Sequence, residues 1–145
     1  MNRTFVMLGV LALGMAGSVH AAEFDVIETR QAGQDLMNGT FVGIRAVVAS
    51  KGDVRTLTNS GKAIARWIRQ YPTLFPPGSD KGHNTKALPA IWTDRAGFEA
   101  AAGDLAAEAD KLVQLAAAGD TDGVAKQVKA IGDACSACHS TYRAK

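Results

Sequence analysis

The stretch "VAKQVKAIGDACSACHSTY", residues 124 to 142, lies just before the end of this 145-residue chain. Its apolar and sulfur-bearing residues follow one another in steps of four, three, four, three and four: Val124, Val128, Ile131, Cys135, Cys138 and Tyr142. That spacing places these side chains on one face of an α-helix. The pattern therefore predicts a helix from about Gly123 to Tyr142 whose inner face carries both cysteines of the chain.

Three other segments show helical spacing, and none shows the alternation typical of a strand. They run from about Phe24 to Ser50, from Asp53 to Tyr71 and from Asp94 to Ala118. Short turns join the first pair of helices and the last pair, which favours antiparallel neighbours. The expected fold is all-α, an antiparallel up-down-up-down four-helix bundle that forms a single domain over residues 23–145.

All four prolines fall between the second and third predicted helices, in "PTLFPPGSDKGHNTKALPAIW", which begins at Pro72. Because proline is excluded from helix interiors, this segment is expected to be a long connection. Its residues Phe75, Leu88, Ile91 and Trp92 predict that it packs onto the bundle. The residues expected to face the core from the first three helices are Ile27, Met37, Phe41, Ile44, Val48, Leu57, Ile64, Trp67, Ile68, Phe98, Leu105, Ala109 and Leu112.

The N-terminal segment is typical of a secretory signal peptide. Arg3 precedes an apolar run from Phe5 to Gly17, and small residues at Ala21 and Ala22 offer a cleavage point, so residues 1–22 are expected to be removed. An uncleaved anchor is the alternative, but the run is shorter than the roughly 20 apolar residues that span a bilayer. Export predicts a bacterial periplasmic protein with no membrane association after cleavage. Losing Arg3 lowers the formal charge from +2 to +1, which gives no sign of nucleic-acid binding.

The cysteines belong to the motif C-x-x-C-H, formed by Cys135, Cys138 and His139, which is typical of c-type haem attachment. On a helix, two cysteines three residues apart share a face, with their Cβ atoms about 5–6 Å apart. The two thiols can then add to the two vinyl groups on one edge of the porphyrin, and the adjacent imidazole can bind the iron. The motif predicts one covalent haem c per chain.

Other roles for the two cysteines fit less well. A thioredoxin-like dithiol lies near a βαβ unit, which this chain does not predict. A zinc site needs a fourth ligand, and after signal cleavage the only histidine besides His139 is His83 in the long connection. A disulfide between residues three apart in a helix is strained and closes almost no loop.

Two polar residues interrupt the apolar face of the first helix. Arg30 and Gln34 lie on the line from Ile27 to Met37. A buried arginine or glutamine needs polar partners, and haem offers two propionates and an iron centre. The alternative is that Arg30 extends to solvent at the end of the bundle and Gln34 faces a water.

The chain resembles the class II c-type cytochromes, the cytochrome c′ family, over essentially the whole mature sequence. The resemblance lies in "TRQ" (Thr29–Gln31), "LFPPGS" (Leu74–Ser79), "ALPAIW" (Ala87–Trp92), "GFEAAA" from Gly97 and "CSACHSTYRAK" at the end. The C-terminal place of the motif is itself specific, since class I cytochromes carry theirs near the N-terminus. The resemblance implies that Cys135 and Cys138 form the thioethers and that His139 is the proximal iron ligand.

The resemblance also implies the surroundings of the haem. Arg30 and Gln31 match the family pair that contacts the propionates. Lys86 falls near a propionate, where the family often has an acid or another loop residue, although a lysine suits a carboxylate partner. Arg143 matches the arginine beside the proximal histidine.

Gln34 departs from the family pattern. High-spin members usually have an apolar residue here, over the distal face of the iron, and low-spin relatives use a methionine near this place as the sixth ligand. We therefore expect an iron without a strong sixth protein ligand, with Gln34 as a weak ligand, a hydrogen-bond donor to a bound diatomic molecule, or a holder of water. The alternative is that Met37 is the sixth ligand after a local shift of the helix, which would raise the redox potential.

The expected function is electron transfer in the periplasm with an unidentified redox partner. A nitric oxide or carbon monoxide binder, acting as a sensor or scavenger, is the alternative. An enzyme such as a peroxidase is not expected, because the sequence shows no distal acid–base pair. The family also implies a homodimer through the first two helices, whose faces include Phe41, Val42, Val47 and Trp67.

Overall fold

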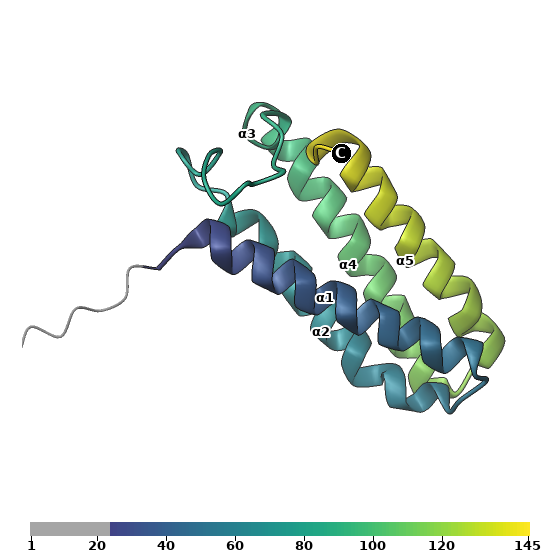
Figure 1. The fold of residues 1–145 in the computed structure, drawn as a ribbon. Helices are drawn as coiled ribbons and strands as arrows, with labels where there is room; N and C mark the ends of the chain where they lie inside the picture. Colours follow the sequence, from purple (N-terminus) through teal and green to yellow (C-terminus); the bar gives the residue numbers. More distant parts are fainter. Residues whose placement is uncertain (1–23) are drawn as a thin grey trace, which may run out of the picture.

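The computed structural model describes residues 24–145, which form a four-helix bundle (Figure 1). The long helices are α1 (Val26–Ala49), α2 (Thr58–Gln70), α4 (Arg95–Ala118) and α5 (Thr121–Tyr142). The short segments are the 3₁₀ turns η1 (Val54–Leu57) and η2 (Tyr71–Leu74) and the helix α3 (Ala90–Thr93). Within residues 24–145 the only β-type pairing is an isolated bridge between Ala87 and Arg143, so the all-α prediction is confirmed. The predicted signal peptide, residues 1–22, lies outside the described residues.

Aspartate side chains set the starts of α1, α4 and α5 by accepting hydrogen bonds from free backbone N–H groups of the first turn. Asp25 accepts two such bonds, at 2.8 and 3.0 Å. Asp94 caps α4 and Asp120 caps α5 in the same way. With Asp120 as its cap, α5 begins at Thr121 rather than at the predicted Gly123.

The second predicted helix is divided, so the prediction of one continuous helix from Asp53 to Tyr71 is wrong at its ends. Asp53 caps the 3₁₀ turn η1, and the α-helical part begins only at Thr58. At the other end α2 stops at Gln70, and the chain tightens into η2. Pro72 lies in η2 and has no N–H with which to continue the α-helical hydrogen bonding.

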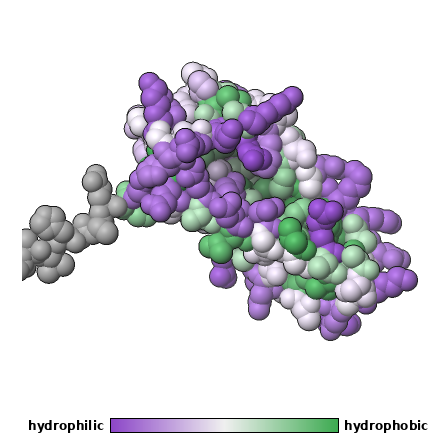
Figure 2. All heavy atoms as spheres, viewed as in Figure 1, coloured by the Kyte–Doolittle hydropathy of each residue, from purple (hydrophilic) through white to green (hydrophobic). Residues whose placement is uncertain are grey.

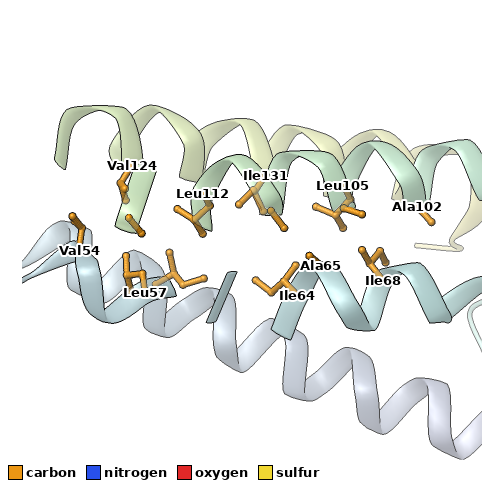
Figure 3. Close-up of a cluster of buried hydrophobic side chains, with 14 residues drawn as sticks. Val54, Leu57, Ile64, Ala65, Ile68, Ala102, Leu105, Leu112, Val124 and Ile131 are labelled. Atoms are coloured by element: carbon orange, nitrogen blue, oxygen red, sulfur yellow. The ribbon is translucent and has the colours of Figure 1, made fainter. Parts of the chain in front are cut away.

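The core lies mainly between α2 and α4, as Figure 3 shows. Ile64 and Ile68 of α2 point toward Leu105 of α4, and all three are less than 5% exposed. Gly61 allows the two helices to approach closely, because a Cβ atom there would lie 2.8 Å from a methyl group of Val113. The close pairing of α2 with α4 forms the most densely packed part of the bundle.

Helix α1 packs more sparsely than the others, with limited contacts to α2 and α5. Of the α1 residues that the sequence spacing predicted for the core, Ile27 and Ile44 are buried. Met37, Phe41 and Val48 are only partly buried. Most of the core residues predicted elsewhere in the chain are also buried, namely Leu57, Ile64, Ile68, Phe98, Leu105, Ala109 and Leu112. Trp67, also predicted for the core, is partly exposed. The loose fit of α1 leaves space inside the bundle.

The connection from α2 to α4 lies over the end of the bundle where α1 begins and α5 ends (Figure 1). Phe75 and Ile91 are buried there in a cluster with Phe98 and Tyr142. The N–H of Leu88 also donates to the carbonyl of Tyr142 at 3.1 Å. The prediction that this connection packs onto the bundle is confirmed, and it ties α1 and α5 together at one end.

Candidate functional site

Helix α5 presents both cysteines and the neighbouring histidine to one cavity. Cys135 and Cys138 are free, partly buried thiols, and His139 lines the same cavity. Burial raises the pKa of both thiols. Burial, with a smaller contribution from the nearby Arg143 cation, lowers the pKa of the His139 imidazole. Both effects favour the neutral imidazole, the state in which histidine binds a metal.

The cavity has a volume of about 720 Å³ and lies between α1 and the other three long helices. Apolar side chains form much of its wall, including Ile64, Ile68, Phe98, Leu105 and Ile131. In Figure 2, hydrophilic side chains surround a hollow whose interior shows apolar surface. The volume is within the range of roughly 300–1,000 Å³ usual for sites of small molecules and cofactors.

Arg30 lines the cavity on α1, yet its hydrogen bonds go to the long connection. The guanidinium donates to the carbonyls of Leu74 and Ser79 at 3.0 and 2.7 Å, and to the hydroxyls of Ser79 and Thr85 at 2.9 and 3.0 Å. It also lies 4.2 Å from the centre of the Phe75 ring. Arg30 is 2% exposed, so it does not extend to solvent at the bundle end, and that alternative is wrong.

Gln31, Lys86 and Arg143 lie at the same end of the cavity and also contact the connection or the C-terminus. The Gln31 amide donates to the carbonyl of His83 at 3.0 Å. The Lys86 amine donates to the carbonyl of Lys145 at 3.1 Å. The backbone of Arg143 pairs with that of Ala87, and its exposed side chain reaches the cavity wall. The structure thus brings these sequence-predicted residues together around one opening.

Gln34 and Met37 line the cavity from the middle of α1. Met37 packs against the main hydrophobic core. The side-chain oxygen of Gln34, Oε1, is buried and has no hydrogen-bond partner in the described part of the chain. An unpaired buried acceptor costs free energy, so this atom is a destabilising feature of the α1 wall.

Tyr71 is a cavity residue that the sequence analysis did not single out. Its ring packs against Phe75 and Trp67, with ring centres 5.0 and 5.9 Å apart. Burial raises the pKa of its hydroxyl, and a contact from the Gln34 side chain works in the opposite direction. Its spacing from Ile64 and Ile68, by seven and three residues, could have placed it on the inner face.

Residues 24–145 contain no cluster of side chains that could bind a metal ion without a cofactor. No group of three or more histidine, cysteine or acidic side chains there is arranged to hold a metal ion. His83, the one histidine that a zinc site could add, instead pairs with Asp25 at 2.7 Å. The zinc alternative therefore lacks a fourth ligand in this part of the chain.

Comparison with known proteins identifies the family of this chain. The family model described as Cytochrome C' matches residues 25–143. A cytochrome c' from Rubrivivax gelatinosus is 36% identical over 123 residues, which cover 83% of this chain and 95% of that protein. The chain therefore belongs to the cytochrome c′ family, and it is a c-type cytochrome with covalently bound haem c.

Two solved structures are similar as well. One is a nitric oxide complex of a mutant of cytochrome c prime from Alcaligenes xylosoxidans, with 28% identity, a TM-score of 0.74, and coverage of 83% of this chain and 94% of that one. The other is a cytochrome c' described as having an unusual ligand-controlled dimer dissociation, with 28% identity, a TM-score of 0.77, and coverage of 83% and 95%. The residues of the cavity fit the haem group, because two thiols and a neutral imidazole face a largely apolar space of suitable size.

Proposed function

We propose that this chain is a periplasmic electron carrier whose haem lies in the bundle cavity, with no strong protein ligand on its distal side. The observation that carries the proposal is the contrast between two cavity walls. The α5 wall has two thiols and an imidazole, whereas the α1 wall has an amide, Gln34. Bound haem supplies a ferric/ferrous couple that exchanges one electron. The proposal includes no enzymatic reaction.

The chain's own residues hold and orient the group in this proposal. Cys135 and Cys138 attach it covalently, and the neutral His139 imidazole binds the iron from the proximal side. Around the opening, Gln31 and Lys86 are cavity-lining donors within reach of carboxylates at the propionate end. Arg143 lies beside His139 and keeps the proximal side polar.

Arg30 remains a proposed propionate contact, together with Gln31. Its Nη donors are already engaged by the connection. In the proposal it therefore acts on the propionates chiefly through its charge and by fixing the connection that carries Thr85 and Lys86.

Sixth-ligand coordination by Met37 is the main alternative for the distal side. Met37 lines the cavity, but it also packs against the main core. Using its sulfur as a ligand would withdraw it from those contacts. Replacing Met37 with Leu preserves the volume closely and removes the thioether. A low-spin spectrum that becomes high-spin in this variant would support the alternative.

Nitric oxide or carbon monoxide binding is the second candidate function. A cavity wall without a strong iron ligand leaves space for a diatomic molecule, and a similar solved structure is a nitric oxide complex. Electron transfer and gas binding use the same site, so the two proposals differ in physiological role rather than in residues.

A homodimer is also proposed, since a similar cytochrome c' is described by its dimer dissociation. Leu36 is 74% exposed and Phe24 is 67% exposed, and both line a shallow hollow of about 590 Å³ on the outer side of α1 and α2. Trp67, one of the residues expected on the dimer face, also lines this hollow. Phe41 lines the haem cavity and Val47 packs against the core, so these two contribute less to an outer face than expected.

Periplasmic location rests on the signal-like N-terminal sequence. Among residues 24–145, no helix is long and apolar enough to cross a membrane. Fractionation of cells that express the full chain, followed by mass measurement of the purified protein, would locate it and identify the cleavage point. A chain that keeps residues 1–22 in the membrane fraction would contradict the proposal.

The decisive experiment is an optical spectrum of the purified protein in both oxidation states, with and without nitric oxide and carbon monoxide. We expect high-spin bands that change on addition of either gas. A sharp low-spin spectrum that ignores both gases would refute the open distal site. Replacing Cys135 and Cys138 with serine should abolish haem that survives denaturing electrophoresis, and haem retained covalently in that variant would refute the attachment.

A further inference from the structure

The residue proposed to bind the haem iron, His139, lies in the last turn of α5, close to the end of the chain. The end turns of a helix open more easily than its middle, because some of their backbone groups lack partners. The hydrogen bond that closes this turn, from the N–H of Arg143 to the carbonyl of His139, is long at 3.3 Å. An imidazole on such a turn needs further contacts if it is to keep one orientation.

The side chain of Tyr142 ties this last turn to the start of α4. Its hydroxyl donates to Oδ2 of Asp94 at 2.8 Å. The hydrogen bond to this carboxylate raises the pKa of the hydroxyl, which keeps it protonated as a donor. Tyr142 is 7% exposed, and its ring packs edge-on against Phe98 with ring centres 5.2 Å apart. A buried ring and a hydrogen bond to a charged group therefore fix the end of α5 to α4.

The backbone around Tyr142 is tied to the long connection as well. The carbonyl of Tyr142 accepts from the N–H of Leu88 at 3.1 Å, and the N–H of Ala144 donates to the carbonyl of Lys86 at 2.8 Å. Figure 1 shows the C-terminus beside α3, in agreement with the contacts between α3 and α5. The last turn of α5 is thus held by side chain to α4 and by backbone to the connection.

The two oxygens of the Asp94 carboxylate have separate partners. Oδ1 accepts from the N–H of Gly97 at 3.2 Å and so caps α4, while Oδ2 accepts from Tyr142. Gly97 also leaves room for this pair, because a Cβ atom there would lie 2.6 Å from the Tyr142 hydroxyl oxygen. The start of α4 is therefore shaped to receive the tyrosine as well as to begin a helix.

We propose that the hydrogen-bonded pair of Tyr142 and Asp94 positions the His139 imidazole and so sets the strength of its bond to the iron. This rests on the proposed ligation by His139. Tyr142 comes three residues after His139 and four after Cys138, so they are neighbours on the helix surface, and all three line the cavity. Cys138 also packs against the cluster that contains Tyr142. Tyr142 is a positioning residue, since it acts through the turn that carries the ligand.

Two substitutions break the pair in different ways. Tyr142→Phe keeps the ring and removes the hydroxyl. Asp94→Ser keeps a good helix cap, but its single oxygen cannot serve both partners. In each variant the last turn should open roughly three- to tenfold more often, the range expected for one hydrogen bond. Faster amide hydrogen exchange in residues 141–144, measured by mass spectrometry, reports this opening.

The iron–histidine stretching band in the resonance Raman spectrum of the ferrous, haem-loaded protein tests the positioning role. In Tyr142→Phe and in Asp94→Ser this band should broaden, because the imidazole then takes several orientations. The double variant should match the single ones, since both changes break the same hydrogen bond. A structural role alone would lower the melting temperature and leave the band unchanged.

The chain offers a matched control and a rescue variant. Asp120 caps α5 at the opposite end of the bundle through the N–H of Gly123 at 2.9 Å, so Asp120→Ser should leave both the band and the exchange of residues 141–144 unchanged. Asp94→Asn keeps two polar atoms, one for the cap and one for Tyr142, so its band should stay close to that of the unchanged protein.

Two results would overturn the inference. The first is a Tyr142→Phe variant whose iron–histidine band keeps its position and width, even if the protein melts at a lower temperature. The second is equal hydrogen exchange at the end of α5 in Tyr142→Phe and the unchanged protein. Failure of the proposed ligation by His139 gives a different result, because the unchanged ferrous protein would then lack this band altogether.

Discussion

Replacing the buried Arg30 with alanine should destabilise the folded protein more than the same change at an exposed arginine. Arg30 is 2% exposed, and its two terminal nitrogens make four hydrogen bonds to the connection between α2 and α4. Its loss leaves the carbonyls of Leu74 and Ser79 without this donor. It also removes the cation that lies 4.2 Å from the Phe75 ring centre.

The magnitude follows from these contacts. A hydrogen bond to a charged group contributes about 1.5–3 kcal/mol net, and bonds that share a nitrogen are not independent, so two full bonds are a reasonable count. Alanine does not have the cost of ordering the long arginine side chain on folding, which offsets about 2 kcal/mol of this loss. The expected net loss is therefore about 1–4 kcal/mol. For a chain of this size, such a loss lowers the melting temperature by roughly 10 °C.

The assay is thermal unfolding of the haem-loaded protein followed by far-ultraviolet circular dichroism. Arg66→Ala is the matched control, because Arg66 is an exposed arginine on α2, and a surface change of this kind should stay within about 0.5 kcal/mol. Arg30→Lys keeps the charge but loses the planar fork, so its melting temperature should lie between the two.

Limited proteolysis gives an independent measurement. In Arg30→Ala the connection around Ser79 and Thr85 loses its anchor on α1, so a protease should cut there before it cuts the helices. Equal melting temperatures for Arg30→Ala and Arg66→Ala, with an unchanged cleavage pattern, would refute the argument that Arg30 holds the connection in place.

Leu112→Ala should cost about 2–5 kcal/mol in a denaturant titration, because Leu112 is fully buried at 0% exposure; a loss below 1 kcal/mol would contradict the described core. Gly33→Ala should displace the Trp67 ring, since the new Cβ would overlap it, and unchanged tryptophan fluorescence would argue against that packing. Backbone N–H groups of the first turn of α1, and more weakly His83, lower the pKa of Asp25. Its contribution to stability is therefore present above the unfolded value of 3.8 and is lost as the pH falls through the lower folded value. Asp25→Asn should weaken this acid dependence, and identical pH profiles for both proteins would exclude it.

Much of the fold followed from spacing within single helices. The steps of three and four from Val124 to Tyr142 predicted α5 correctly to its last residue. The prolines after Pro72 marked the long connection. Errors arose where a cap or a proline controlled one turn, as at Asp53 and Asp120. Periodicity describes the middle of a helix, whereas hydrogen bonds of individual side chains decide its ends.

Some features of the cavity residues could be predicted from the sequence, and others could not. Arg30 and Gln34 stood out because polar residues interrupted an apolar face, and the cavity indeed includes both. Which partners Arg30 meets could not be predicted, because Ser79 and Thr85 lie 49 and 55 residues away along the chain. Tyr71 was missed, since an aromatic residue at helical spacing usually belongs to a core.

By itself, the sequence determined the attachment motif, the helices that carry it and the polar interruption of α1. These are local properties, because three- and four-residue spacing sets which side chains share a helix face. Only the tertiary structure decided that the Arg30 guanidinium binds the connection and that Tyr71 and Gln34 line the same cavity. Those contacts depend on how α1 lies against α2 and the connection, and the sparse packing of α1 is also what opens the cavity beside Cys135.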